Sequence, residues 1–335
     1  MQIDFVIPWV DGSDPEWILQ RSQFSSDSID TDACRFRDWD LLRYWFRAVE
    51  KHAPWVNRIY FVTCGQIPSW LNRDHPKLQI VNHCDYIPQA YLPTFSSHTI
   101  ELNLHRIPGL SEQFVYFNDD MFLNKDVLPE DFFQNGLPRD SAVLEDAILP
   151  EDDDAFAHAQ KNVISFLNRH FSKTEVLASY GKLWLHPCYG KYIIKNLIHF
   201  PGKSFSGIRS FHIPSSIRKS SLEAVWTLEP ELLHKTCKNR FRSTKDVNQY
   251  IATNYQFCTG SFSPRSPGFG KCYRIGKDNK AMYTDIRTGK HKVLCLNDHP
   301  NIDNFEQEKK ELLAIFQKKY PDASQFEIAN KLEIS

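Results

Sequence analysis

The chain has 335 residues, which is long for one domain and allows about two. Lysine plus arginine total 40 and aspartate plus glutamate total 41, so the formal net charge is -1 and no chain-wide basic field is available to bind nucleic acid. Apolar residues make up 41% and charged residues 24%, which excludes a disordered or fibrous chain.

The first third of the chain alternates strand and helix signals. The apolar run at residues 3–10 ends at the turn residues 11–15 and predicts a strand, and the apolar stripe over 38–52 predicts a helix that Pro54 ends. Short apolar runs predict further buried strands at 59–63, 78–81 and 114–117. A helix is expected at about 94–106, before the last of these runs. This order predicts an α/β layer fold with a largely parallel sheet.

The second half of the chain has weaker and mostly helical patterns, at residues 163–171, 222–238 and 245–257. Residues 201–216 are rich in glycine, serine and proline, and residues 259–278 are expected to be mostly loop. The last helix begins after Asp303 or Asn304, either of which can cap it, and Pro321 stops it.

The N-terminus and the cysteines indicate where the protein works. The chain enters a strand-like run at once, without a signal peptide, and no run approaches the ~20 apolar residues of a membrane span. The eight cysteines are scattered without a C-x-x-C pair, so free, buried thiols are expected. We expect a cytoplasmic protein, with contact at the inner face of the membrane through partners as a further option.

Polar residues follow all four predicted strands, at 11–14, 64–66, 83–85 and 118–120. In open parallel sheets, ligands bind beyond the carboxyl ends of the strands. The adjacent carboxylates of Asp119 and Asp120 could hold Mg²⁺ or Mn²⁺ against a diphosphate, or one of them could act as a general base. Asn118 and both aspartates also favour turns, so the residues alone leave a plain strand-end turn open.

Other residues have both a functional and a structural interpretation. Asp11 and Gly12 end the first strand, where they could receive a nucleotide or simply form a tight turn. Arginines that suit phosphate oxygens cluster near the first long helix, at Arg35, Arg37, Arg43 and Arg47. His212 is a lone polar residue in apolar surroundings and can equally be structural. The common nucleotide-triphosphatase, dinucleotide, zinc-protease and serine-hydrolase motifs are absent from the sequence.

Four segments together resemble one known family. They are IDFVIPWVDGSDPEW at 3–17, a long block from RFRDWDLLRYWF at 35 to FNDDMFL ending at 123, FHIPSSIRKS at 211–220 and LCLND at 294–298. These segments are similar to the Stealth family of sugar-1-phosphate transferases, which includes bacterial capsular polysaccharide phosphotransferases and the lysosomal-enzyme N-acetylglucosamine-1-phosphotransferase of animals. The resemblance spans most of the chain.

The resemblance implies a set of site residues. Asp11 and Gly12 would line the nucleotide-sugar site. The active-site wall would contain Arg35, Asp38, Arg43, Ser96, Ser97 and Glu101. The catalytic and metal centre would be Asn118, Asp119 and Asp120, completed by His212, Arg242, Asn297 and Asp298. Mg²⁺ or Mn²⁺ would be held by Asp119, Asp120 and Asp298. Arg37 is not carried over, because an acidic residue commonly stands there in the animal enzymes, and Ser215 replaces a second histidine of the animal pattern.

The resemblance also implies a fold and a reaction. The expected fold is Rossmann-like, with a mostly parallel sheet resembling GT-A nucleotide-sugar transferases and a mainly helical C-terminal part. Residues 1–140 would bind the nucleotide sugar, and residues 141–335 would complete one integrated catalytic unit. The helical and loop-rich part follows the core in sequence.

In the expected reaction, a hydroxyl of an oligosaccharide or polysaccharide attacks the β-phosphorus of a UDP-sugar, UMP leaves, and a hexose-1-phosphate or N-acetylhexosamine-1-phosphate is transferred. Peripheral association with a membrane polysaccharide-assembly complex fits this role, and no nucleic-acid partner is expected. One alternative is a glycosyltransferase that releases UDP. Another is a sugar-binding or scaffold protein in which the carboxylates only form turns.

Overall fold

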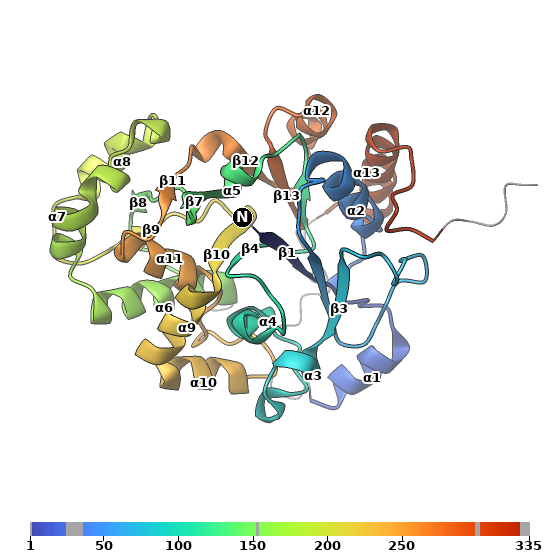
Figure 1. The fold of residues 1–335 in the computed structure, drawn as a ribbon, viewed down its shortest axis with the longest axis horizontal. Coiled ribbons are helices and arrows are strands. Elements are labelled where there is room, and N and C mark those ends of the chain that lie inside the picture. Colours follow the sequence, from blue (N-terminus) through green and yellow to red (C-terminus); the bar gives the residue numbers. More distant parts are fainter. Residues whose placement is uncertain (1, 25–35, 152–153, 299–301, 329–335) are drawn as a thin grey trace, which may run out of the picture.

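The computed structural model describes residues 2–24, 36–151, 154–298 and 302–328. A five-stranded sheet lies at its centre, with the strand order β10-β4-β1-β2-β3 (Figure 1). Four strands are parallel: β1 (Ile3–Pro8), β2 (Ile59–Thr63), β3 (Leu78–Asn82) and β4 (Gln113–Tyr116). At one edge, β10 (Ser215–Arg218) runs antiparallel to β4. These strands confirm the four that the apolar runs predict.

The two faces of the sheet belong to two separate hydrophobic cores. Phe5 and Ile7 of β1 point into one core and Val6 points into the other, because successive strand residues alternate in direction. The first core also contains residues of α2 (Leu42–His52), α12 (Lys280–Thr288) and α13 (Phe305–Lys319). The second contains residues of α4 (Ser97–Leu102), α6 (Ala155–His170), α9 (Lys219–Leu228) and α11 (Tyr250–Cys258). The α/β fold class is therefore confirmed.

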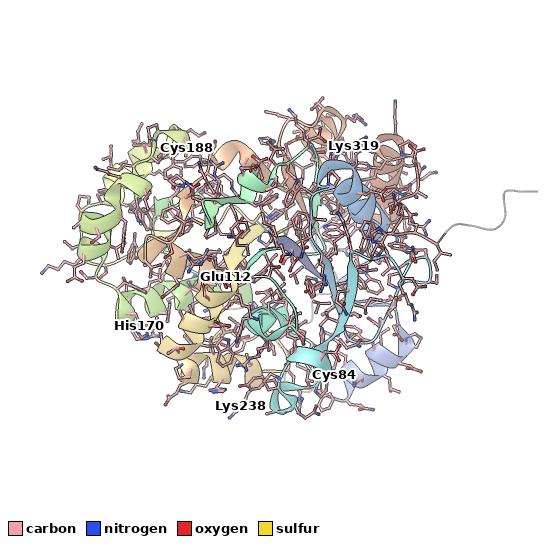
Figure 2. The ribbon with its side chains drawn as sticks, viewed as in Figure 1. Cys84, Glu112, His170, Cys188, Lys238 and Lys319 are labelled. Atoms are coloured by element: carbon pink, nitrogen blue, oxygen red, sulfur yellow. The ribbon has the colours of Figure 1, made fainter. Side chains whose placement is uncertain are left out.

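Both cores combine residues from before and after position 140. In Figure 2 the side chains fill the space between the sheet and its helices. The division into residues 1–140 and 141–335 stays a prediction.

A three-stranded sheet lies next to the carboxyl end of β4. It consists of β12 (Gly270–Arg274), β13 (Val293–Asn297) and β5 (Met121–Leu123), in that order. β5 begins directly after Asp120 and pairs with β13 in antiparallel register, with Cys295 opposite Met121. The backbone N–H of Leu296 donates to the carbonyl oxygen of Asp120 at 2.8 Å. This pairing brings the segment 294–298 to the end of β4.

The remaining elements are short or peripheral. The helices are α1 (Pro15–Ser22), α3 (His83–Tyr86), α5 (Pro129–Phe132), α7 (Lys173–Trp184), α8 (Tyr192–His199) and α10 (Pro230–Lys238). The strands are β6 (Phe133–Gln134), β7 (Leu137–Asp140), β8 (Leu144–Glu145), β9 (Gly207–Ile208) and β11 (Ser263–Pro264). None of the helices in the described segments has the length and apolar character that crossing a bilayer requires.

Two sequence expectations can be compared directly with the elements. The last helix begins as predicted, because the side chain of Asn304 accepts a hydrogen bond from the backbone N–H of Gln307 at 3.1 Å. The expected loop at 259–278 was wrong in part, because it contains β12. β12 begins at Gly270, and glycine is a residue type that argues against a strand in the sequence. The structure requires glycine at this position, because a Cβ there would lie 2.4 Å from Cγ2 of Val293.

The seven cysteines in the described segments are free, as expected. They are not uniformly buried. Cys84, which Figure 2 labels near the edge of the molecule, and Cys64 are exposed.

Candidate active site

A cavity of about 570 Å³ lies beyond the carboxyl ends of β1 and β4. Its volume is within the range of about 300–1,000 Å³ that is typical of ligand sites. Ten predicted site residues line it: Asp38, Ser97, Glu101, Asn118, Asp119, Asp120, His212, Arg242, Asn297 and Asp298. Trp9 and Val10 of the first segment also line the cavity, so the fold brings together residues from all four segments of the family resemblance.

Asp120 is the residue on which several polar groups converge. Its Oδ2 accepts hydrogen bonds from Sγ of Cys295 at 3.2 Å and Nδ2 of Asn297 at 3.4 Å, and it lies 3.9 Å from Nε2 of His212. Its Oδ1 is buried and has no hydrogen-bond partner among the described residues. A buried carboxylate oxygen without a donor fits a bound cation.

A metal ion would have mixed ligands at this position. Ligand atoms of Asp120, His212 and Cys295 all lie within 4.8 Å of one another. Mg²⁺ and Mn²⁺ prefer oxygen ligands, whereas imidazole and thiolate suit softer ions. The cluster therefore offers one ligand of the kind that Mg²⁺ and Mn²⁺ prefer, the carboxylate of Asp120, and its other two donors differ from the predicted set of three aspartates.

Asp119 has an electrostatic environment that suits proton transfer. Its side chain is exposed on the cavity wall. Desolvation of the carboxylate by the protein around the cavity raises the pKa of Asp119 to about 7, and the negative charge of Asp120 adds to this shift. The positive charge of Arg242 opposes it. A carboxylate with a pKa near neutrality is matched to the work of a general base at physiological pH.

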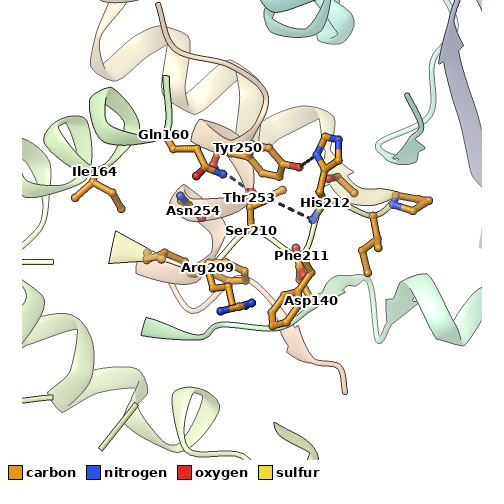
Figure 3. A pocket seen from close by; sticks show the side chains of 15 residues that line it. Asp140, Gln160, Ile164, Arg209, Ser210, Phe211, His212, Tyr250, Thr253 and Asn254 are labelled. Carbon is orange, nitrogen blue, oxygen red and sulfur yellow. Dashed lines mark hydrogen bonds between the residues drawn. The ribbon is translucent and has the colours of Figure 1, made fainter. Parts of the chain in front are cut away.

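His212 is fixed in place by Tyr250 of α11. Figure 3 shows the hydroxyl of Tyr250 pointing at the imidazole, where it lies 3.0 Å from Nδ1. Burial raises the pKa of Tyr250 strongly, so its hydroxyl stays protonated. When this hydroxyl donates to Nδ1, Nε2 of the neutral ring carries the hydrogen and faces Asp120. The backbone of His212 has a φ of 48°, which is a strained value for a residue with a side chain.

Asp298 pairs with two other residues of the cavity wall. Its carboxylate receives Nε of Arg37 at 3.0 Å, Nη2 of Arg37 at 3.2 Å and the indole N–H of Trp39 at 3.2 Å. Such a two-pronged ion pair fixes both partners. Asp298 is not among the residues whose ligand atoms converge within the described segments. Arg37, which the sequence analysis set aside, thus belongs to the cavity wall.

Comparisons with known proteins decide the family. The conserved regions 1 and 2 of Stealth proteins match residues 1–28 and 35–140. The exopolysaccharide phosphotransferase cps2G of Lactiplantibacillus plantarum is 43% identical over 97% of this chain and 96% of its own length. The capsular polysaccharide phosphotransferase WcwK of Streptococcus pneumoniae is 39% identical over 97% and 98%. The chain belongs to the Stealth family.

Solved structures resemble this Stealth protein in outline. The galactosyltransferase LgtC, in complex with donor and acceptor sugar analogues, aligns over 96% of this chain and 98% of its own. The identity is 11% and the TM-score is 0.40, so no property of that enzyme is transferred to this chain.

Two predicted wall residues of the Stealth protein hold the cavity from its α4 side. Nη2 of Arg242 donates to Oγ of Ser97 at 2.8 Å, which holds the guanidinium at the first turn of α4. Glu101 is buried and accepts hydrogen bonds from the hydroxyl of Tyr116 at 3.3 Å and the backbone N–H of Gln249 at 3.1 Å. Glu101 therefore joins β4 to the start of α11.

Asp11 and Gly12 do not line the cavity, but they are next to residues that do. The backbone N–H of Asp11 donates to Oε1 of Gln66 at 2.8 Å, and Nε2 of Gln66 donates back to the carbonyl of Asp11 at 3.0 Å. A Cβ on Gly12 would lie 2.3 Å from the carbonyl oxygen of Phe36. Val10 and Phe36 line the cavity beside them. A side chain at position 12 would displace Phe36 and change the shape of the site.

The other predicted residues lie elsewhere. Arg35 is outside the described residues. Ser96 is buried before α4 and does not line the cavity. Arg43 lies on another face of α2, where its Nε is 3.6 Å from Oε2 of Glu327 and its guanidinium covers the ring of Trp70. Arg43 therefore does not reach the cavity.

Arg274 is a cavity residue that the sequence analysis missed. It ends β12, in register with Asn297 of β13, and its side chain is exposed. It has no hydrogen bond or ion pair within the described segments. An arginine that is free to bind an anion therefore faces the same cavity as the two aspartates. Recognising β12 in the sequence would have found it, because β12 ends at the cavity edge.

Proposed function

We propose that this Stealth protein is a polysaccharide phosphotransferase that moves a hexose-1-phosphate or N-acetylhexosamine-1-phosphate from a UDP-sugar to a hydroxyl of an oligosaccharide or polysaccharide. Its relatives cps2G and WcwK are named polysaccharide phosphotransferases, which supports this assignment. The observation that carries it is the convergence of Asp119, Asp120, His212 and Arg242 in one cavity. A cytoplasmic location and peripheral association with a membrane polysaccharide-assembly complex are part of the proposal.

The residues have separate roles in the proposed displacement. Asp119, with its pKa near neutrality, takes the proton of the attacking hydroxyl. Arg242, Arg274 and Nε2–H of His212 stabilise negative charge on the phosphoryl oxygens, and UMP departs. When bound, Mg²⁺ or Mn²⁺ would supply positive charge to the diphosphate, and Asp120, whose Oδ1 has no hydrogen-bond partner among the described residues, would hold it.

The nucleotide product tests this function. With a UDP-sugar carrying ³²P at the β-position, a phosphotransferase releases unlabelled UMP and places the label in an acid-labile phosphodiester of the acceptor. A glycosyltransferase breaks the C1–O bond instead, and all the label leaves as UDP. That second outcome would contradict the proposal. Turnover of any UDP-sugar would exclude a mere sugar-binding or scaffold protein.

Replacing Arg274 by alanine is expected to raise the KM for the UDP-sugar by about 10- to 100-fold, the worth of a charged hydrogen bond. The reason is that Arg274 faces the cavity without another partner in the described structure. Steady-state kinetics with varied donor measures the change. The matched control is Arg287→Ala, which removes an exposed arginine of α12 outside the cavity and should leave KM unchanged. Equal KM values in both variants would remove Arg274 from the site.

Replacing Tyr250 by phenylalanine is expected to lower kcat by about 3- to 10-fold while the KM for the donor changes little. The hydroxyl that orients His212 is lost, but the ring and its packing remain. Tyr255→Phe on the same helix is the control, because Tyr255 lines neither the active-site cavity nor the smaller cavity beside His212 that Figure 3 shows. A loss of similar size in the Tyr255 variant would show a general effect on α11 and contradict the positioning role.

A further inference from the structure

Helix α8 presents an apolar face to solvent at the end of the molecule where α7 and α8 lie, on the left in Figure 1. The side chains of Ile194, Leu197 and Ile198 are 63%, 52% and 67% exposed. Their i, i+3, i+4 spacing places them on one side of the helix. No other helix in the described segments exposes three large aliphatic residues in this way.

The opposite side of α8 is anchored through a polar residue. Asn196 is fully buried, and its Oδ1 accepts a hydrogen bond from the backbone N–H of Leu144 at 2.6 Å. Its Nδ2 donates to the carbonyl of Ala142 at 2.9 Å and to the carbonyl of Trp184. A surface helix normally places its apolar residues inside and its polar residues outside. α8 buries Asn196 beside the partly buried Tyr192 and Ile193, and the hydrogen bonds of Asn196 hold the second apolar side, Ile194, Leu197 and Ile198, outward.

The sequence segment that contains this face carries lysine and arginine but no acidic residue. From residue 176 to residue 222 the sequence contains no aspartate or glutamate, although the whole chain has 41 acidic residues and a net charge of -1. The same segment contains seven basic residues: Lys182, Lys191, Lys195, Lys203, Arg209, Arg218 and Lys219. Lys191 and Lys195 lie one turn apart at α8 and flank the apolar stripe.

The acidic groups that approach α8 from β8 and the residue after it have basic neighbours. Oε2 of Glu145 lies 3.2 Å from Nη1 of Arg209, and Oδ1 of Asp146 lies 3.7 Å from Nε2 of His199. They do not reverse the sign of the segment.

We propose that α8 docks the protein on an anionic lipid bilayer. Ile194, Leu197 and Ile198 would enter the boundary between the headgroups and the acyl chains, and the lysines would contact lipid phosphates. Charge complementarity favours a lipid surface over a second copy of this chain, because two copies would bring like-charged lysines together. This docking deepens the membrane association in the proposed function, but it involves no step of the transfer reaction.

The docking helix is coupled to the cavity by packing. The ring of Tyr192 contacts that of Phe211 with centroids 5.5 Å apart, and Arg209 lies over both rings. Phe211 directly precedes His212, and Figure 3 shows both at the small cavity next to Tyr250. A lipid surface bound at α8 would therefore lie against the elements that support the His212 side of the active site. A membrane-bound acceptor would approach this side.

Co-sedimentation of the full-length protein with vesicles tests the docking without substrate. We expect binding to vesicles of phosphatidylglycerol and phosphatidylcholine in equal parts, weaker binding as sodium chloride is raised, and little binding to phosphatidylcholine alone. The variants I194Q/L197Q/I198Q and K191E/K195E should each bind at least about tenfold more weakly. The control is I18Q/L19Q, which changes two exposed apolar residues of α1. Circular dichroism should show unchanged folding in all variants, because the altered side chains are exposed or half-buried.

Three outcomes would overturn the inference. They are no binding to anionic vesicles, equal loss in the α1 control, and full binding by the α8 variants. If the wild-type protein instead forms a dimer that I194Q/L197Q/I198Q abolishes, without vesicle binding, the face is a protein interface. The proposed transferase function would fail separately, in the product assay with a soluble acceptor, where the α8 variants should keep wild-type turnover.

Discussion

Replacing Asp119 or Asp120 by asparagine is expected to lower kcat by at least about 100-fold, the scale of a general base or of a central charge in the site. Asparagine keeps the volume of each side chain and removes its negative charge. At position 119 the proton acceptor disappears. At position 120 the amide meets Cys295, Asn297 and His212 without the charge that a cation requires.

The two variants are expected to differ in their pH dependence. In the wild-type protein the rate should rise as the pH passes through about 7, because Asp119 must lose its proton to act as a base. Asp119→Asn should lack this rise. In Asp120→Asn the rise should move to lower pH, because the neighbouring negative charge that raises the pKa of Asp119 is gone. Initial rates from pH 5 to 9 measure both effects.

The matched control is Asp74→Asn, which changes an exposed carboxylate outside the cavity and should keep wild-type turnover. Thermal melting should show that all three variants fold. Near-normal turnover in both cavity variants would show that the reaction centre lies elsewhere.

Removing divalent cations with EDTA is expected to abolish turnover, and added Mn²⁺ or Mg²⁺ should restore it. The reason is that the cavity offers a buried, partnerless Oδ1 on Asp120 beside His212 and Cys295, and few positive charges for a diphosphate. Binding of Mn²⁺ alone, followed by isothermal titration calorimetry, should be lost in Asp120→Asn and retained in Asp74→Asn. Full activity of metal-stripped protein would show that Arg242, Arg274 and His212 stabilise the phosphoryl charge without an ion.

Burial made part of this fold readable from the sequence. β1, β2 and β4 are mostly apolar because helices cover the sheet on both faces, and such runs give a strong strand signal. β12 carries polar residues at 271 and 274 and a glycine at its start, so the same signal fails there. Arg274 was missed for this reason.

The candidate site could be predicted as a set of residues but not as a geometry. Arg43 and Arg37 are both arginines of the first family block, and the three-dimensional fold decides that Arg37 reaches Asp298 and that Arg43 pairs with Glu327. The contact between Tyr250 and His212 joins positions 38 residues apart on different elements. No periodicity of the sequence encodes such a contact.

β1 precedes the other described strands in the sequence and occupies the middle of the sheet, and α13, which follows all of these strands, covers one face of that sheet. The opposite face is covered by helices that lie mostly beyond position 150. A nascent chain therefore carries a sheet with bare apolar surface until α13 has left the ribosome. The native contacts of β1 are long-range, so the sheet is fully covered only after α13 has been synthesised, and the growing chain must be kept from aggregating until then.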